Sequence, residues 1–146
     1  MRLFLTILIF STFSYAVTPF SLENVKSVNI VIADKRKVLQ KQTILKIEKS
    51  VESKLQELGI KTQTDDFINF IIKIDTIKLE EQFAVYVSLF IVESVNPLRD
   101  KELENVAITY KQDDFFIADL LDEEVYESAV EFLLYSFEEQ YLEEQD

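Results

Sequence analysis

The chain has 146 residues, of which 15 are Lys or Arg and 27 are Asp or Glu, so its formal net charge is −12. It contains no His and no Cys, which excludes a Ser-His-Asp triad, a Cys-His pair and a zinc site of the ordinary ligand type. A single glycine excludes a glycine-rich phosphate loop. The acidic excess opposes binding to nucleic acid and to anionic lipid surfaces.

The first 16 residues are typical of a secretory signal. A basic start at Met1-Arg2 precedes a short apolar run, which ends in Ser14-Tyr15-Ala16 with small residues at the two positions that signal peptidase requires. We therefore predict a signal peptide over residues 1–16, cleavage after Ala16, and one domain over residues 17–146. An uncleaved membrane anchor is the alternative, although the apolar run is short for a membrane span.

The stretch from Phe67 to Glu93 is typical of a long β-hairpin. In both arms apolar side chains alternate with other residues, as in strands that bury one face. A turn centred on Glu80-Glu81 would join the arms. The register follows because the apolar rows of both arms must lie on the same face of the sheet. The pairs predicted from this register are Ile74 with Val87, Ile72 with Leu89 and Phe70 with Ile91.

Two elements and a short strand are predicted before this hairpin. Val25 to Ile32 alternates as a strand, and Ile44 to Leu58 has apolar residues at helical spacing, in a helix whose start is open toward Lys35. Thr43 is a candidate N-cap, and Gly59 suits the C-terminal end of the helix. The pattern also predicts a short strand from Ile60 to Gln63.

After the hairpin, the sequence predicts a strand over Val106–Tyr110, a turn at Gln112–Asp114 and a long helix from about Asp119 to Leu142. The resulting element order is β-α-β-β-β-β-α. Because sequential strands lie close enough to form hairpins, we expect an α+β domain: a single, mostly antiparallel sheet with two helices packed on one face.

Carboxylates are the remaining candidates for chemistry. They cluster at Asp65-Asp66, at Asp113-Asp114 and at Asp122-Glu123-Glu124, in predicted turns or at a helix start. A general acid needs a carboxyl whose pKa is raised by burial, so solvated acids are the favoured interpretation. A loose calcium site near Asp113, Asp114 and Asp119 is an alternative, because calcium takes only oxygen ligands.

The last helix is apolar on two sides. Its main stripe faces the expected core, whereas a second stripe lies on nearly the opposite side and consists of Leu121, Val125, Phe132 and Tyr135. A helix of this kind is either buried on both sides or presents one side to a partner. We take this second stripe as the candidate partner-binding surface, for an unknown protein or a second copy of the chain.

Charge is also distributed unevenly along the chain. Residues 35–61 hold eight basic and three acidic side chains, whereas residues 112–146 hold thirteen acidic side chains and no basic one. The two helices can lie side by side so that part of this charge is compensated. The excess on the last helix exceeds what the first helix can neutralise, and it suits a basic partner.

Several hydrophobic patterns come in a recognisable order around the long hairpin. They are Val25-x-x-Val-x-Ile30 and Leu55-x-x-Leu-Gly-Ile60 before it, and Ala107-Ile-Thr-Tyr110 and Ala129-Val-x-x-Leu133 with Phe137 and Tyr141-Leu142 after it. Together they resemble a widespread set of small secreted bacterial proteins of unknown function. More distantly, their order is similar to the amino-terminal domain of TolB-like envelope proteins. The resemblance implies a fold and an envelope setting but supplies no catalytic residue.

These observations lead to two hypotheses for function. The first is a non-enzymatic protein-interaction or envelope accessory module, periplasmic or secreted, with no cofactor, no nucleic-acid partner and no membrane attachment after signal cleavage. The alternative is a small carboxylate-dependent hydrolase or calcium-dependent enzyme. Two buried carboxyl groups in one cleft would favour the enzyme.

The signal can be tested directly. Because Ser14-Tyr15-Ala16 fits the cleavage rule, we predict that the mature protein begins at Val17. Mass spectrometry of the protein isolated from its own envelope should give that amino terminus. An intact Met1-Arg2 start in a membrane-embedded form would contradict the prediction.

Overall fold

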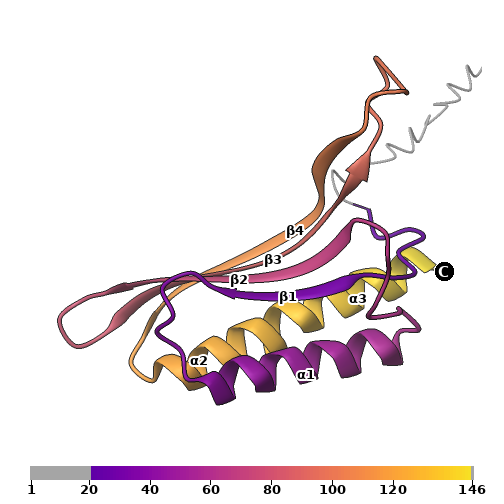
Figure 1. Cartoon of the computed structure of the whole chain (residues 1–146). Coiled ribbons are helices and arrows are strands. Elements are labelled where there is room, and N and C mark those ends of the chain that lie inside the picture. Colours follow the sequence, from indigo (N-terminus) through magenta and orange to yellow (C-terminus); the bar gives the residue numbers. More distant parts are fainter. Residues whose placement is uncertain (1–20, 146) are drawn as a thin grey trace, which may run out of the picture.

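The computed structural model describes residues 21–145 (Figure 1). The predicted signal peptide and its cleavage site at Ala16 lie outside these residues. In chain order the elements are β1 (Asn29–Asp34), α1 (Lys41–Glu57), β2 (Ile68–Lys78), β3 (Phe83–Val95), β4 (Asn105–Ala118), α2 (Leu121–Tyr126), the π-helical segment η1 (Glu127–Leu134) and α3 (Tyr135–Gln145). The last three follow one another without a break and form one long C-terminal helix.

The predicted α+β class is confirmed. Four strands form one sheet in the order β1-β2-β3-β4, with β1 parallel to β2 and the other neighbours antiparallel. Helix α1 and the C-terminal helix both pack on the same face of this sheet (Figure 1). The described domain therefore has two layers, and its second sheet face carries no helix.

The register of the central hairpin is also confirmed. Ile74 pairs with Val87, Ile72 with Leu89 and Phe70 with Ile91. All six side chains are buried. The turn falls at Glu80-Glu81 as predicted, and the Leu79 amide donates to the Gln82 carbonyl oxygen over 2.9 Å.

The core lies between this hairpin and the helices. Helix α1 contributes Ile47, Val51 and Leu55, which recur at helical spacing and are fully buried. From the C-terminal helix, the Phe137 ring packs edge-on against Phe70, with 5.0 Å between ring centroids, and against Tyr110 at 5.4 Å. Such edge-to-face contacts add directional preference to the burial of apolar area.

Two predictions before the hairpin are wrong. Ile60–Gln63 forms no strand of the sheet; Lys61 makes only an isolated bridge to Ser27. The turn at Gly59, whose φ is +76°, returns the chain to residues 26–28 and away from β1. The pairing therefore stays limited to this one bridge. Thr43 does not cap α1, because the helix begins two residues earlier and the Thr43 hydroxyl donates to Asp122.

The predicted turn at Gln112–Asp114 is wrong as well. These residues continue β4, in which Asp113 pairs with Ser88 and Asp114 with Val87 of β3. Polar residues are tolerated here because Asp113 has a partner in the sheet and Asp114 has one in the C-terminal helix. The Lys111 ammonium lies 2.8 Å from Asp113, and the Ser128 hydroxyl donates to Asp114 over 2.8 Å.

The unlike charges of the two helices compensate in part, as expected. Lys54 of α1 forms an ion pair with Glu138 of the C-terminal helix over 2.9 Å. The Asp122 carboxylate accepts the Gln40 amide at the start of α1, where a negative charge is favourable. Between residues 21 and 145, no helix is both long and apolar enough to cross a membrane.

Truncation of the hairpin core should lower stability. Ile72→Ala removes a fully buried side chain beneath the helices, so the free energy of unfolding should fall by about 2–5 kcal/mol. The matched control is Ile77→Ala, in the same strand but on the open face with 58% of its surface exposed. Chemical denaturation should give a change within about 0.5 kcal/mol for the control. Equal losses in both variants would contradict the placement of the core.

Candidate functional site

The second stripe of the C-terminal helix divides into exposed and buried members. Phe132 and Tyr135 are 52% and 53% exposed, as expected for residues that face away from the core. Val125 is fully buried, so its assignment to a partner surface is wrong. Leu121 is partly buried and packs against the core. The exposed aromatic part of the stripe is thus the pair Phe132 and Tyr135.

The π-helical segment explains this division. Its hydrogen bonds run from residue i to i+5, so each residue advances less around the axis than in an α-helix. Residues before Glu127 are therefore rotated relative to those after Leu134, and a uniform α-helical spacing misplaces them. The buried positions instead follow a four-residue spacing through Val125, Ala129, Leu133, Phe137 and Tyr141.

Strand β4 forms one edge of the sheet. It pairs with β3 on one side, and no strand within residues 21–145 pairs with its other side. Two apolar side chains of this strand, Phe115 and Ile117, are 68% and 46% exposed on the face without helices. A long edge strand flanked by exposed apolar residues is a template for pairing with another chain.

A groove lies between this edge and the C-terminal helix. Its volume is about 370 Å³. Two aromatic side chains line it, one from the strand and one from the helix, and its other lining residues are polar or acidic. We call it the β4 groove, and its residues are Asp114, Phe116, Glu124, Glu127, Ser128, Glu131 and Phe132.

The carboxylates of the β4 groove differ in their partners. Glu124 accepts the backbone amides of Asp119 and Leu120 over 2.8 and 2.7 Å, so it stabilises the start of the helix. Asp114 accepts a hydrogen bond from Ser128. Glu127 and Glu131 are exposed, one turn apart, and neither forms an ion pair with any residue the structure describes. Within the described residues, none of the groove's carboxylates forms an ion pair, and Glu127 and Glu131 are the two that also lack a hydrogen-bond donor.

On the opposite face of β4, charges are paired. Lys111 forms an ion pair with Asp113, and the Tyr86 hydroxyl donates to the same carboxylate over 2.6 Å. Partial burial opposes ionisation of Asp113, but the Lys111 ammonium and the nearby hydroxyl groups of Ser88 and Tyr86 together outweigh it and lower the pKa of the carboxyl. This network holds β3 and β4 together across the open face.

The candidate calcium ligands do not converge. Asp113 and Asp114 point to opposite faces because they are successive residues of a strand. Asp119 accepts a hydrogen bond from Gln82 near the β2–β3 turn. Across residues 21–145, no group of three or more Asp or Glu side chains is arranged to hold a metal ion.

The carboxyl groups with clearly shifted pKa values also lack the character of a general acid. Besides Asp113, they are Asp75 and Glu144, and in all three the pKa is lowered. For Asp75 the causes are Lys35 first and then Arg36, each 3.2 Å from the carboxylate. A general acid requires the opposite shift.

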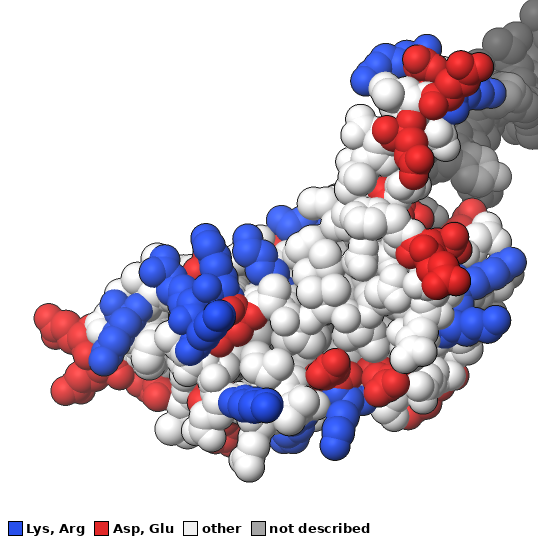
Figure 2. Space-filling view, viewed as in Figure 1, with Lys and Arg blue, Asp and Glu red and all other residues white. Residues whose placement is uncertain are grey.

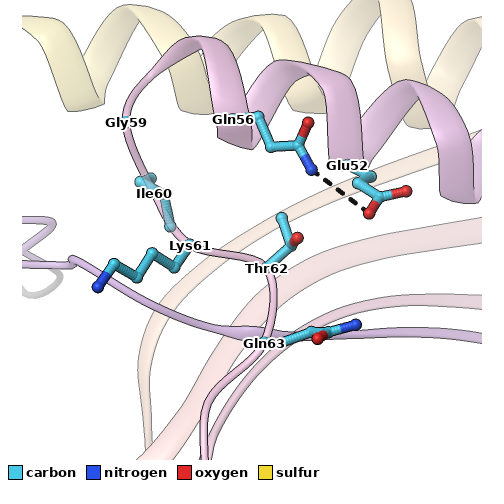
Figure 3. A pocket seen from close by; sticks show the side chains of 7 residues that line it. All are labelled: Glu52, Gln56, Gly59, Ile60, Lys61, Thr62 and Gln63. Atoms are coloured by element: carbon cyan, nitrogen blue, oxygen red, sulfur yellow. Dashed lines mark hydrogen bonds between the residues drawn. The ribbon is translucent and has the colours of Figure 1, made fainter.

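A second hollow lies at the end of α1 (Figure 3). It has a volume of about 530 Å³ and is lined by Glu52 and Gln56 of the helix and by residues 59–63 of the following segment. Gln56 donates to Glu52 over 3.4 Å. Glu52 is the one acid in the lining and Lys61 the one base, so no set of charged groups converges on a common point.

The surface on the β1 side of the molecule differs in charge from the C-terminal helix. Figure 2 shows Lys and Arg side chains gathered next to the acidic tip of the β2–β3 turn, with a wide uncharged area beside them. Lys35 and Arg36 belong to this side, since they follow β1 and bind Asp75 of β2. Lys35 and Arg36 thus lie toward β1, whereas Glu127 and Glu131 lie on the C-terminal helix beside β4.

Comparison with known proteins gives no relative from which a role follows: no model of a protein family matches the chain, and no curated protein is significantly similar to it. The resemblance to small secreted bacterial proteins stays a prediction.

The edge residues of β4 are absent from the sequence-based site. Phe115, Phe116 and Ile117 follow two aspartates, and the pair Asp113-Asp114 indicated a turn. The signal that identifies them is the alternation that continues from Tyr110 through Gln112, Asp114 and Phe116 to Ala118, which matches the buried or half-buried face of the strand.

The network at Asp113 should make stability depend on pH. Because the folded-state pKa of Asp113 lies below its ordinary value of about 4, ionised Asp113 stabilises the fold above that pH. The contribution is lost as the pH falls through the folded-state pKa. Asp113→Asn should therefore lower the melting temperature at neutral pH, and the difference from wild type should shrink on acidification.

Asp65→Asn provides a control for this measurement. Asp65 is exposed, and its carboxylate makes no hydrogen bond or ion pair with the described residues. Its substitution should change the melting temperature little at neutral pH. A difference for Asp113→Asn that stays constant down to low pH would contradict an electrostatic role.

Proposed function

We propose that this protein is an exported, non-enzymatic interaction module that acts by binding another protein through the side formed by β4 and the C-terminal helix. The observation that carries the proposal is the pair of half-exposed aromatic rings, Phe132 and Tyr135, on a helix whose sheet-facing side is fully buried. Exported location rests on the signal-like residues 1–16.

Exposed aromatic side chains with a charged rim are typical of binding anchors. A few such residues supply most of the binding energy of an interface, and polar residues around them exclude water. Here Phe132 borders the β4 groove with its acids, and Phe115 and Ile117 expose further apolar surface on the other face of the same strand. The lowered pKa values of Asp75, Asp113 and Glu144 favour structural roles for these acids, which supports an interaction module over a carboxylate-dependent enzyme.

Replacing the two aromatic rings should abolish partner binding without unfolding the protein. We predict that Phe132→Ser with Tyr135→Ser removes capture of the partner from envelope extracts and alters the melting temperature little, because both rings are half exposed. The partner captured by the wild-type protein should then be purified and its binding measured in a binary assay. The double variant should weaken that binding by roughly 30-fold or more, since the loss of a single hot-spot residue costs about 2 kcal/mol.

Leu45→Ser is the matched control for this experiment. Leu45 is 43% exposed on α1, so the substitution also removes an exposed apolar side chain but from the other helix. It should leave binding unchanged. Unfolding of the double variant would show the rings to be core residues, and unchanged binding would show that the partner uses another surface.

A further inference from the structure

We propose that β4 binds an extended segment of the partner as an additional strand, and that this segment carries Lys or Arg at alternate positions, directed into the β4 groove. The inference rests on the proposed function and names the chemistry of its partner and the mode of binding. Its evidence comes from the backbone edge of β4, from each of its two faces, and from the charges that a second copy of the chain would bring.

The backbone of β4 provides the template. From Tyr110 to Ala118 the strand pairs regularly with β3, and the irregularity next to Ile91 and Val92 lies before this stretch. Along an edge, every second residue directs its N–H and C=O away from the sheet. No described strand occupies this side, so an incoming strand would satisfy those groups. Backbone hydrogen bonds then give affinity, and alternate side chains give specificity.

On the face without helices, β4 offers apolar contacts. Phe115 and Ile117 are exposed there, and both lie on the same side because they are two residues apart. Side chains of an added strand that point to this face would lie directly beside them. Apolar or β-branched residues at those positions would bury the two side chains in cross-strand pairs.

On the other face, the β4 groove suits a long basic side chain. Phe116 and Phe132 form the apolar lining, and Glu127 and Glu131 provide carboxylates that form no ion pair with a described residue. The two glutamates also line a neighbouring hollow that Lys46 borders. Lys and Arg have an aliphatic stem that packs on apolar surface and a charged head that reaches beyond it. A Lys or Arg at every second position of the added strand would therefore place its aliphatic stem on the two aromatic rings and its charged head near the two carboxylates.

The charge pattern favours another protein over a second copy of the chain. If β4 paired with β4 of a second copy, the residues facing each groove would come from the alternating set Tyr110, Gln112, Asp114, Phe116 and Ala118. This set contains no base and adds an acid. The one base within Tyr110–Ala118, Lys111, belongs to the other face and is paired with Asp113. Self-pairing would thus bring like charges together, which is unfavourable.

The test uses the purified protein and a synthetic peptide as long as the Tyr110–Ala118 stretch, in which Val and Arg alternate. We expect saturable binding by fluorescence anisotropy. Residue-resolved hydrogen exchange should show the outward amides of β4 slowed at least tenfold on saturation, because strand pairing protects them. A peptide of the same composition in shuffled order, and one with N-methylated amides at alternate positions, should each bind at least tenfold more weakly.

Charge variants locate the basic side chains. Glu127→Gln with Glu131→Gln should weaken binding roughly tenfold and reduce its dependence on salt. The matched control, Glu80→Gln with Glu81→Gln, makes the same charge change at the exposed hairpin tip and should leave the affinity nearly unchanged. Equal losses in both variants would indicate diffuse attraction to an acidic protein and would overturn the proposal.

Other outcomes also decide the matter. Undiminished binding of the N-methylated peptide, or β4 amides that do not change, would overturn strand addition. A dimer in sedimentation that already protects these amides would make a second copy the occupant. If the captured partner binds through Phe132 and Tyr135 while β4 amides stay unprotected in the complex, strand addition is wrong and the interaction module stands. If neither partner nor peptide binds, both proposals fail.

Discussion

The fold depends on the register of the β2–β3 hairpin, which decides which side chains of the two strands share a face. Its register places one apolar row, with Ile72, Ile74, Val87 and Leu89 at its centre, beneath the helices. A slip by one residue would bury the Asn69, Lys73 and Asp75 side of β2 and expose the apolar row. Burial of this row fixes which face of the sheet the helices cover, and it thereby fixes which face stays open, whereas the strand order leaves β4 at an edge.

The composition of the second sheet face follows from the small number of helices in the domain. Two helices cover one face, so the other face must be compatible with solvent (Figure 1). It is made so by paired charges, with Lys35 and Arg36 on Asp75 near β1 and Lys111 on Asp113 near β4. Several apolar residues of this face stay exposed, and Phe115 and Ile117 are the two that lie in the edge strand β4 on the face opposite to the groove.

Sequence reasoning succeeded where the pattern is set by one buried face. The hairpin register, the first helix and the class of fold followed from alternation and helical spacing alone. It failed where tertiary partners override local preference. Asp113 and Asp114 suggest a turn by composition, yet Lys111, Tyr86 and Ser128 stabilise them within a strand. Only the assembled sheet brings these partners together.

The sequence predicted only part of the candidate surface, because the π-helical segment changes the angular positions of the residues before it. Phe132 lies near the end of the π-helical segment and Tyr135 directly after it. Their angular positions around the helix axis relative to Leu133 and Phe137 are therefore close to those of an α-helix. Val125 lies before the π-helical segment, so the wider turns rotate it into the core. A π-helical segment leaves no composition signal of its own. The edge strand, in turn, depends on strand order, which a single sequence does not specify.

The central claim is that β4 is an open edge in the free protein. Residue-resolved hydrogen exchange of the purified protein, without any peptide or partner, tests it most directly. Amides of β4 that point toward β3 should exchange slowly, whereas the alternate amides from Tyr110 to Ala118 should exchange quickly. The amides of β3 and of Asn69–Ile74 in β2, which have a neighbouring strand on both sides, should be uniformly slow. Uniform protection along both sides of β4 would contradict the account, because it would mean that this edge is already occupied.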